Sequence, residues 1–289
     1  MRPKEETFTK YKLILFTTLA MIAFAGNSLL CRAALKQTDI DTASFTSIRL
    51  LSGAMMLWLL IVFRGRLSEA KGQGSWSSAL ALFVYAAGFS YAYSSLETGT
   101  GALLLFGAVQ ATMIAYGFYL GERFNSRQAF GLAMAFVGVV SLLLPGLSAP
   151  PLVASVIMII AGVAWGVYSI QGKGAVDSTL VSAGNFLRTI PFVLLLSVFA
   201  MDHYSLDVMG VCLAVASGAL ASSLGYIVWY AVLPSLKATT ASTVQLSVPA
   251  IAALGGILFL GEPITLRFAL ASIALLGGIA LVLTKKQVR

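Results

Sequence analysis

Apolar runs long enough to cross a membrane recur along this 289-residue chain at intervals of 25 to 30 residues. A helix needs roughly 20 predominantly apolar residues to span a bilayer, and each run approaches that length. Only 10% of the residues are charged and 58% are hydrophobic, whereas a soluble domain carries about 25% charged residues. The chain is therefore predicted to be an all-α integral membrane protein whose surroundings are the lipid bilayer.

The apolar runs predict ten transmembrane helices. Polar or charged residues, glycine or proline separate one run from the next, which is typical of short loops between spans. We place the helices at residues 11–34, 43–63, 77–96, 100–120, 127–144, 152–171, 180–200, 208–233, 239–260 and 266–284.

One stretch of the chain occurs twice, 140 positions apart. Leu120-Gly121-Glu122 recurs as Leu260-Gly261-Glu262, and the 26 residues that begin at Phe118 match seven identical residues in the segment that begins at Leu258. Self-similarity at a fixed offset indicates an internal duplication. We predict two five-helix repeats, over residues 11–144 and 152–284, joined by the uncharged linker 145–151 with its three prolines.

The repeated stretch also predicts where helices end and begin. Gly121 and Gly261 stand where a glycine usually terminates a helix in the left-handed conformation. Asn125 or Ser126 in the first repeat, and Thr265 in the second, are expected to cap the start of the following helix.

An odd number of spans per repeat has a topological consequence. The second repeat must enter the membrane from the opposite face, so the two repeats are expected to be inverted, as in many alternating-access transporters with a substrate site near the midplane. With the amino terminus inside, the inner segments carry fourteen Lys and Arg residues and the outer segments carry three, Arg32, Lys36 and Arg267. This asymmetry predicts that both termini are cytoplasmic.

The order of four motifs resembles that of a known family. Phe24-Ala25 and Trp165-Gly166 are aromatic-small pairs early in each half, Arg49 and Arg188 lie early in each second helix, and Leu-Gly-Glu follows each fourth helix. The chain is thereby similar to the drug/metabolite transporter superfamily, specifically its EamA-type members, over essentially its whole length. It departs from the family pattern at Phe24-Ala25, where Trp-Gly is typical, and at Arg123, where a proline is typical.

The resemblance implies a secondary transporter that exports or exchanges small organic metabolites across the bacterial inner (plasma) membrane. Family substrates include amino acids, sugars, sugar phosphates, nucleotide sugars and cationic drugs. In size and layout the chain looks most like the bacterial aromatic amino acid exporters, which favours aromatic or neutral amino acids. Sugar conjugates, organic cations and lipid carriers are the alternatives.

Polar side chains within the spans are the first candidates for substrate binding, because polar groups in a bilayer usually face a cavity or the bundle interior. The amides of Asn27, Gln110 and Gln245 both donate and accept hydrogen bonds and would suit the polar head of an amino acid. Hydrogen bonds between helices are the competing explanation. Other polar residues far from span ends are Asn185, Arg188, Thr243 and Ser247.

Aromatic side chains form the second set of candidates. Tyr85, Phe89 and Tyr93 recur every four residues, and Trp165 and Tyr168 share a helix face, as do residues around Tyr226. Such faces could line a cavity that stacks an aromatic ring or holds a cation. The alternative is a position at headgroup level, which the sequence favours for Tyr93 and Trp229. We predict that Tyr85, Phe89, Trp165, Tyr168 and Tyr226 belong to the substrate site.

Arg49 and Arg188 lie close to the starts of their helices, so the sequence favours interfacial anchors that extend to the surface over counter-charges for a substrate carboxylate. All eleven acidic residues fall in tails, loops or helix ends. Without a carboxylate at mid-membrane, we expect facilitated exchange or uniport, or proton use through a peripheral Glu.

The sequence speaks against other functional classes. Nothing pairs a nucleophile with a base, so an enzyme is not expected, and neither a charged ring nor a carbonyl filter suggests a channel. The net charge of +8 does not form a basic stripe interleaved with aromatics, so nucleic acid is not an expected partner. We expect no cofactor and no metal, a small-molecule substrate as partner, and a monomer or weak homo-oligomer.

Overall fold

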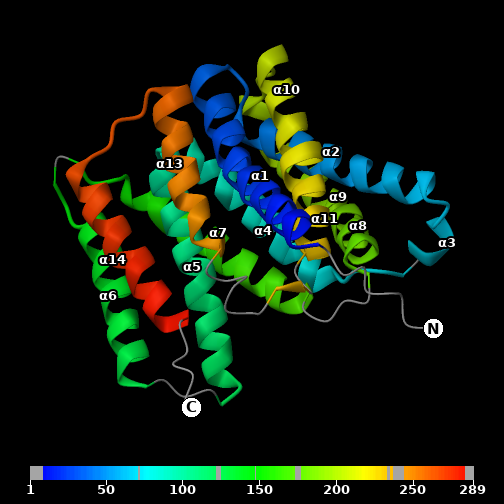
Figure 1. Ribbon diagram of the computed structural model, residues 1–289. Coiled ribbons are helices and arrows are strands. Elements are labelled where there is room, and N and C mark those ends of the chain that lie inside the picture. Colours follow the sequence, from blue (N-terminus) through cyan, green and yellow to red (C-terminus); the bar gives the residue numbers. More distant parts are fainter. Residues whose placement is uncertain are drawn as a thin grey trace.

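The computed structural model describes residues 9–70, 72–121, 125–146, 148–172, 177–232, 235–236 and 244–283, with the backbone alone at His203. Within these residues all regular structure is helical, and the helices form one bundle (Figure 1). Eight helical segments are long and apolar enough to cross a membrane, and one further apolar helix is shorter. Together with the helix Trp76–Tyr93 these account, within the described residues, for ten helices, so the predicted all-α membrane fold with ten transmembrane helices is confirmed.

In the part of the first repeat that the structure describes there are five long helices and one short one. They are α1 (Lys10–Gln37), α2 (Thr42–Phe63), α3 (Leu67–Ala70), α4 (Trp76–Tyr93), α5 (Thr98–Tyr119) and α6 (Ser126–Leu143). The second repeat contains α7 (Leu152–Gly172), α8 (Ser178–Arg188), α9 (Ile190–Phe199), the short 3₁₀ turn Met201–His203, α10 (Val208–Val215), a π-helix (Ala216–Leu224), α11 (Gly225–Val232), α13 (Ser247–Leu260) and α14 (Leu266–Leu283).

The helix ends predicted from local sequence are confirmed. Asn125 caps α6 in a capping box, because its side chain accepts from the Gln128 backbone amide at 3.0 Å and the Gln128 side chain accepts from the Asn125 backbone amide at 3.1 Å. Thr265 caps α14 by accepting from the Phe268 amide at 3.1 Å. Gly261 ends α13 with φ 64°, in the left-handed region that glycine adopts without penalty.

Two spans predicted as continuous helices are interrupted. The seventh span breaks at Thr189 between α8 and α9, where Pro191 lies in the first turn of α9 and lacks an amide to donate. The eighth span changes from α-helix to π-helix over Ala216–Leu224 and back. π-Helical turns are rare and frequently occur at functional sites.

Helix packing relates the two repeats reciprocally. The third span of the first repeat, α4, packs on α7 of the second repeat, and the third span of the second repeat, α10–α11, packs on α1 of the first. In the same way the fourth helix of the first repeat, α5, packs on α7, and the fourth helix of the second repeat, α13, packs on α1. The fourth helices of each repeat, α5 and α13, pack on each other, as do the fifth helices, α6 and α14, which Figure 1 shows side by side at one flank. This exchange of partners is what a pseudo-two-fold relation between the repeats produces.

A glycine allows one of these helix pairs to approach closely. A Cβ at Gly162 of α7 would lie 2.5 Å from the backbone oxygen of Leu105 in α5. The spacing Gly162-x-x-x-Gly166 is one that lets another helix approach closely, and Gly166 likewise faces Thr112 of α5. The contact places Trp165, between the two glycines, close to α5.

Candidate functional site: an aromatic cavity between the repeats

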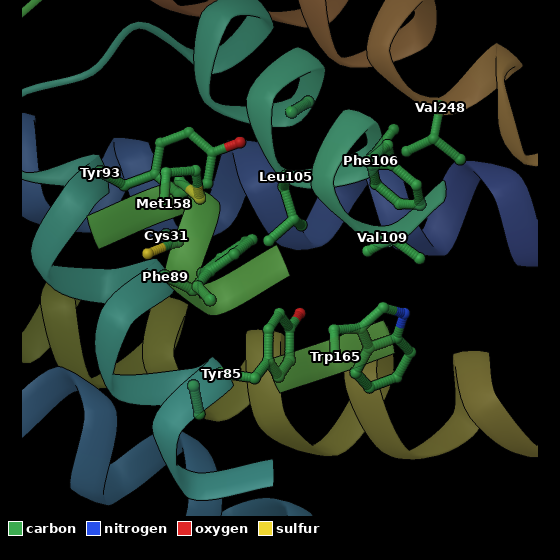
Figure 2. Close-up of a cluster of buried hydrophobic side chains, with 14 of the residues drawn as sticks. Cys31, Tyr85, Phe89, Tyr93, Leu105, Phe106, Val109, Met158, Trp165 and Val248 are labelled. Carbon is green, nitrogen blue, oxygen red and sulfur yellow. The ribbon is translucent and has the colours of Figure 1, made fainter. Parts of the chain in front are cut away.

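A small cavity with aromatic walls lies between the two repeats. Its walls come from α1, α4 and α5 of the first repeat and from α7, the π-helix and α11 of the second. Figure 2 shows Leu105, Phe106 and Val109 of α5 pointing toward Tyr85 and Trp165. The lining residues are Phe24, Asn27, Ser28, Tyr85, Phe89, Leu105, Phe106, Trp165, Ala221 and Tyr226.

Rings from both repeats pack around this cavity. Trp165 lies at the centre, with its ring centroid 4.8 Å from that of Tyr85 and 4.8 Å from that of Tyr226. Phe89 continues the wall on α4, 5.5 Å from Tyr85, and Phe24 lies edge-on to Tyr226 at 6.0 Å. Offset and edge-to-face pairs of this kind stabilise a packed aromatic cluster.

Asn27 is the polar centre of the cavity wall. Its Nδ2 donates to the Tyr85 hydroxyl at 3.4 Å, and its Oδ1 accepts from Ser217 Oγ at 2.6 Å and from Ser222 Oγ at 3.5 Å. The two serines belong to the second repeat, so this network joins the repeats across the cavity. Asn27 is buried and its amide is hydrogen-bonded at both ends.

The π-helix explains why two serines reach the same amide. Ser217 and Ser222 are five residues apart, which places them on different faces of an α-helix but one above the other in a π-helix with its i→i+5 hydrogen bonds. The segment also packs tightly on α2, because a Cβ at Gly218 would lie 2.0 Å from the Arg49 backbone oxygen. Local irregularity in α10–α11 therefore builds the polar side of the cavity.

Arg49 is buried beside the cavity and is not an interfacial anchor, which corrects the interpretation favoured from the sequence. It is only 2% exposed. Its guanidinium lies 4.6 Å from the ring centroid of Phe89 and 5.3 Å from that of Tyr85, and its Nη2 donates to the Tyr85 hydroxyl at 3.1 Å. Arg49 lies near the start of α2, as the sequence indicated, but the helices packed around α2 cover it.

Arg188, the repeat counterpart of Arg49, has a different environment. It is half-buried at the end of α8 and donates to the backbone oxygens of Gln73 and Gly184. Asn185, one turn earlier, accepts from the Ser75 amide at 2.9 Å and donates to Tyr168 at 3.5 Å. These contacts hold the segment before α4 against α8, so Asn185 and Arg188 have structural partners away from the cavity.

The structure brings five of the eight predicted site residues together in the cavity wall: Asn27, Tyr85, Phe89, Trp165 and Tyr226. Tyr168 is buried behind the wall and stacks on Trp165 at 5.4 Å. Gln110 is buried in α5, one turn beyond Phe106, and its Nε2 has no hydrogen-bond partner among the described residues. Gln245 is half-buried just before α13 and does not line the cavity. Thr243 and Glu122 lie outside the described residues.

Two aromatic residues assigned to the membrane interface are buried. Tyr93 is fully covered and donates to the backbone oxygen of Thr98 at 3.2 Å, and Trp229 packs edge-on against Phe24 at 6.1 Å. Both lie near helix ends, as the sequence showed, but neighbouring helices cover them. Their position in sequence therefore did not indicate their exposure.

A buried ion pair closes one end of the bundle. Arg32 Nε lies 3.2 Å from Glu262 Oε1, and both side chains are less than a tenth exposed. Arg32 also donates from Nη1 to the backbone oxygens of Tyr93 and Ser94, while Glu262 Oε2 accepts from the Thr98 amide at 2.8 Å. The ion pair thus ties α1, the end of α4 and the start of α5 to the loop after α13.

Sequence reasoning missed several members of the site. Ser217 and Ser222 gave no signal, because their spacing matches neither face of an α-helix. Leu105, Phe106 and Ala221 look like ordinary membrane-core residues. Arg32 and Glu262 were expected among the loop and helix-end charges, because a contact between residues 230 positions apart cannot be recognised without the fold.

Comparison with known proteins identifies the family. The EamA-like transporter family matches residues 11–144 and 152–284. An uncharacterised protein of Pseudomonas aeruginosa is 54% identical over 94% of this chain and 95% of its own length. An uncharacterised transporter of Archaeoglobus fulgidus is 26% identical over 94% of this chain and 98% of its own length.

Two further similarities bear on function and fold. The threonine/homoserine exporter RhtA of Salmonella typhimurium is 33% identical over 49% of this chain and 50% of its own length. A crystal structure of a protein with 17% sequence identity superposes with a TM-score of 0.68, covering 95% of this chain and 98% of the other, which shows a shared fold. With both halves of the chain matched by one family, the protein belongs to the EamA-like transporter family of the drug/metabolite transporter superfamily.

Proposed function

We propose that this protein is a secondary transporter that exports or exchanges small organic metabolites, foremost aromatic or neutral amino acids, by alternating access between two inverted repeats. The observation that carries the proposal is the aromatic cavity between the repeats, lined by Trp165, Tyr85 and Tyr226 around the amide of Asn27. Its apolar walls suit a hydrophobic side chain, and its few polar groups suit an amino acid head. The similarity to an exporter of threonine and homoserine over half of the chain supports this choice of substrate class.

We place the protein in the bacterial inner membrane with both termini cytoplasmic, following the distribution of Lys and Arg. In this orientation Ser148, in the linker between the repeats, faces outward, and Ser68, in α3, faces the cytoplasm. Both are exposed. A membrane-impermeant thiol reagent should label Ser148→Cys but not Ser68→Cys in intact cells, in a background without Cys31 and Cys212. The opposite pattern would reverse the orientation.

The same orientation puts the Arg32–Glu262 ion pair on the outer side of the cavity. Every residue of α5 from Thr98 to Gln110 is buried, whereas most of the residues from Ala111 to Tyr119 are exposed. The bundle is therefore more tightly packed at the proposed outer end. We interpret the structure as a state closed toward the outside, in which the ion pair and the helix ends around it form the closure.

For coupling, we propose exchange or uniport, with a peripheral glutamate as the alternative. No described acidic residue lines the aromatic cavity. Glu97 and Glu262 line a separate hollow at the outer end of α5, together with Pro263 and Phe268. A substrate accumulation that strictly follows an imposed pH gradient would favour proton coupling through one of these two carboxylates.

Counterflow in proteoliposomes tests the proposal. Vesicles loaded with unlabelled Phe, Trp, Met and Thr are tested for entry of labelled Phe, with Trp165→Ala and Gln245→Ala beside the wild type. Saturable uptake lost in Trp165→Ala would establish an amino acid exchanger that uses the cavity, and loss in Gln245→Ala would add Gln245 to the substrate site. Uptake no higher than in empty liposomes would reject amino acids and leave sugar conjugates, organic cations and lipid carriers to be tested.

A further inference from the structure

Arg49 brings a positive charge to the cavity wall, and no described carboxylate balances it. The three ion pairs among the described residues involve Arg32 and Arg66 but not Arg49. One guanidinium nitrogen, Nη2, donates to Tyr85, while Nη1 is buried and has no hydrogen-bond partner among the described residues. A charge buried among helices is unfavourable unless it is paired.

The Tyr85 hydroxyl transmits this charge to the cavity. Its oxygen accepts hydrogen bonds from Arg49 Nη2 and from Asn27 Nδ2, and a phenol oxygen has only two lone pairs to accept with. The Tyr85 hydroxyl can therefore still donate its own hydrogen to a ligand. Because Tyr85 lines the cavity and Arg49 lies behind it, the Tyr85 hydroxyl is a hydrogen-bond donor that the Arg49 guanidinium and the Asn27 amide both polarise.

We propose that Tyr85, backed by Arg49, is the anion-recognition group of the cavity and restricts the substrate to carboxylate-bearing compounds. Tyr85 contacts the carboxylate, and Arg49 acts as a positioning residue that supplies positive charge through Tyr85 and from its own free Nη1. The inference rests on the proposed transport function and narrows its substrate class to carboxylic acids and amino acids. Organic cations, one of the alternatives for this family, are disfavoured because the same charge repels them.

The remaining walls of the cavity fit the rest of such a substrate. Trp165, Phe24 and Tyr226 offer apolar ring faces, which suit a hydrophobic side chain and also attract an ammonium group at a distance from Arg49. A zwitterion is thus held by a donor at one end and rings at the other. The ammonium group of the substrate would therefore be bound by ring faces and not by a carboxylate of the protein.

The test compares ligands that share one skeleton but differ in charge. Purified wild-type protein, reconstituted in lipid nanodiscs, is titrated with phenylalanine, 3-phenylpropionate, phenylalaninamide and phenethylamine, and binding is measured by thermal stabilisation and tryptophan fluorescence. Both carboxylates should bind at least tenfold more tightly than the amine. Leucine and isoamylamine form a second matched pair for a smaller side chain.

Variants separate a charge role from a structural one. Arg49→Gln and Tyr85→Phe should each weaken binding of both carboxylates about tenfold or more while leaving binding of the amide and the amine unchanged or tighter, and Arg49→Lys should restore part of the difference. Arg188→Gln is the matched control, because the repeat places an arginine there that is held by backbone oxygens away from the cavity. Variants are compared only after gel filtration shows a monodisperse peak.

Each outcome bears on the inference. Equal weakening of all ligands in Arg49→Gln would assign Arg49 a structural role and overturn it. Tighter binding of amines than carboxylates would also overturn it, while leaving transport of small organic molecules intact. Binding of neither class would reject both the inference and the amino acid substrate.

Discussion

Arg32 in α1 and Glu262 after α13 form an ion pair of 3.2 Å that is almost completely shielded from solvent and joins the first repeat to the second. Each partner also satisfies backbone groups of α4 or α5, so four segments meet at these two side chains. Breaking a buried pair leaves one charge without a partner, which is the costly case for ion pairs in proteins.

Replacing Glu262 by Gln should open this end of the bundle. The change removes the ion-pair partner of the buried Arg32, at a cost of about 3–5 kcal/mol. Cys31 is next to Arg32 and is fully buried, so it reports on opening. In a Cys212→Ser background, a membrane-impermeant maleimide should label Cys31 faster in Glu262→Gln than in the parent. Asp39→Asn, an exposed acidic residue near the same end, is the control, and equal rates in Glu262→Gln and the parent would contradict the closure.

Trp165→Phe should weaken substrate binding without unfolding the protein. Phenylalanine keeps an aromatic ring between Tyr85 and Tyr226 but loses contact area with both, and aromatic pairs are worth about 0.5–1.5 kcal/mol beyond burial. The Michaelis constant for counterflow should rise several-fold. Trp58→Phe, at an exposed position in α2, should leave it unchanged. An unchanged constant in Trp165→Phe would place the substrate elsewhere.

Two glycines should respond oppositely to alanine. Gly218→Ala puts a Cβ 2.0 Å from the Arg49 backbone oxygen, so α2 and the π-helix must separate, and the melting temperature should fall by several degrees. Gly26 lies within α1 with nothing within 4 Å of an added Cβ. Gly26→Ala should therefore raise stability by up to about 1 kcal/mol, as alanine favours the helix. Thermal unfolding in detergent measures both.

Glu97 should make stability depend on pH in the weakly acidic range. Burial raises the pKa of the Glu97 carboxyl above its ordinary value, the nearby Glu262 carboxylate raises it further, and Arg32 and Lys36 oppose the increase. A raised carboxyl pKa means that the folded state binds the proton more tightly, so stability increases as pH falls through that pKa and decreases when Glu97 ionises.

Glu97→Gln should accordingly be more stable than the wild type at neutral pH, and the difference should shrink as the pH is lowered. Melting temperatures between pH 4 and 8 provide the measurement. A constant difference across the pH range would mean that Glu97 does not titrate there.

Features that depend on local sequence could be predicted. The caps at Asn125 and Thr265 and the left-handed Gly261 follow from neighbours within four residues, and all three are confirmed. The close approach at Gly162 follows from a spacing within one helix. Fold class and helix number follow from hydropathy, which can be read along the sequence without knowing which distant segments are in contact.

Features that depend on contacts between distant segments could not be predicted. Arg49 looked like a surface anchor because its burial is imposed by Tyr85 and Phe89, which a sequence without a fold does not place nearby. The break at Thr189 had a signal in Pro191, two residues later, but the π-helix had none. Gln245 and Gln110 were grouped as one polar set by chemistry alone, and the structure places them at different depths of burial.

The π-helix also sets the rotational phase between α10 and α11. In an α-helix each residue advances the direction of the side chains by about 100°, and a π-type turn holds more residues than an α-type turn. If the nine residues Ala216–Leu224 wound as a regular α-helix instead, Tyr226 and Trp229 would turn away from Phe24. The aromatic wall contributed by α11 is therefore encoded by a count of residues as much as by their identity.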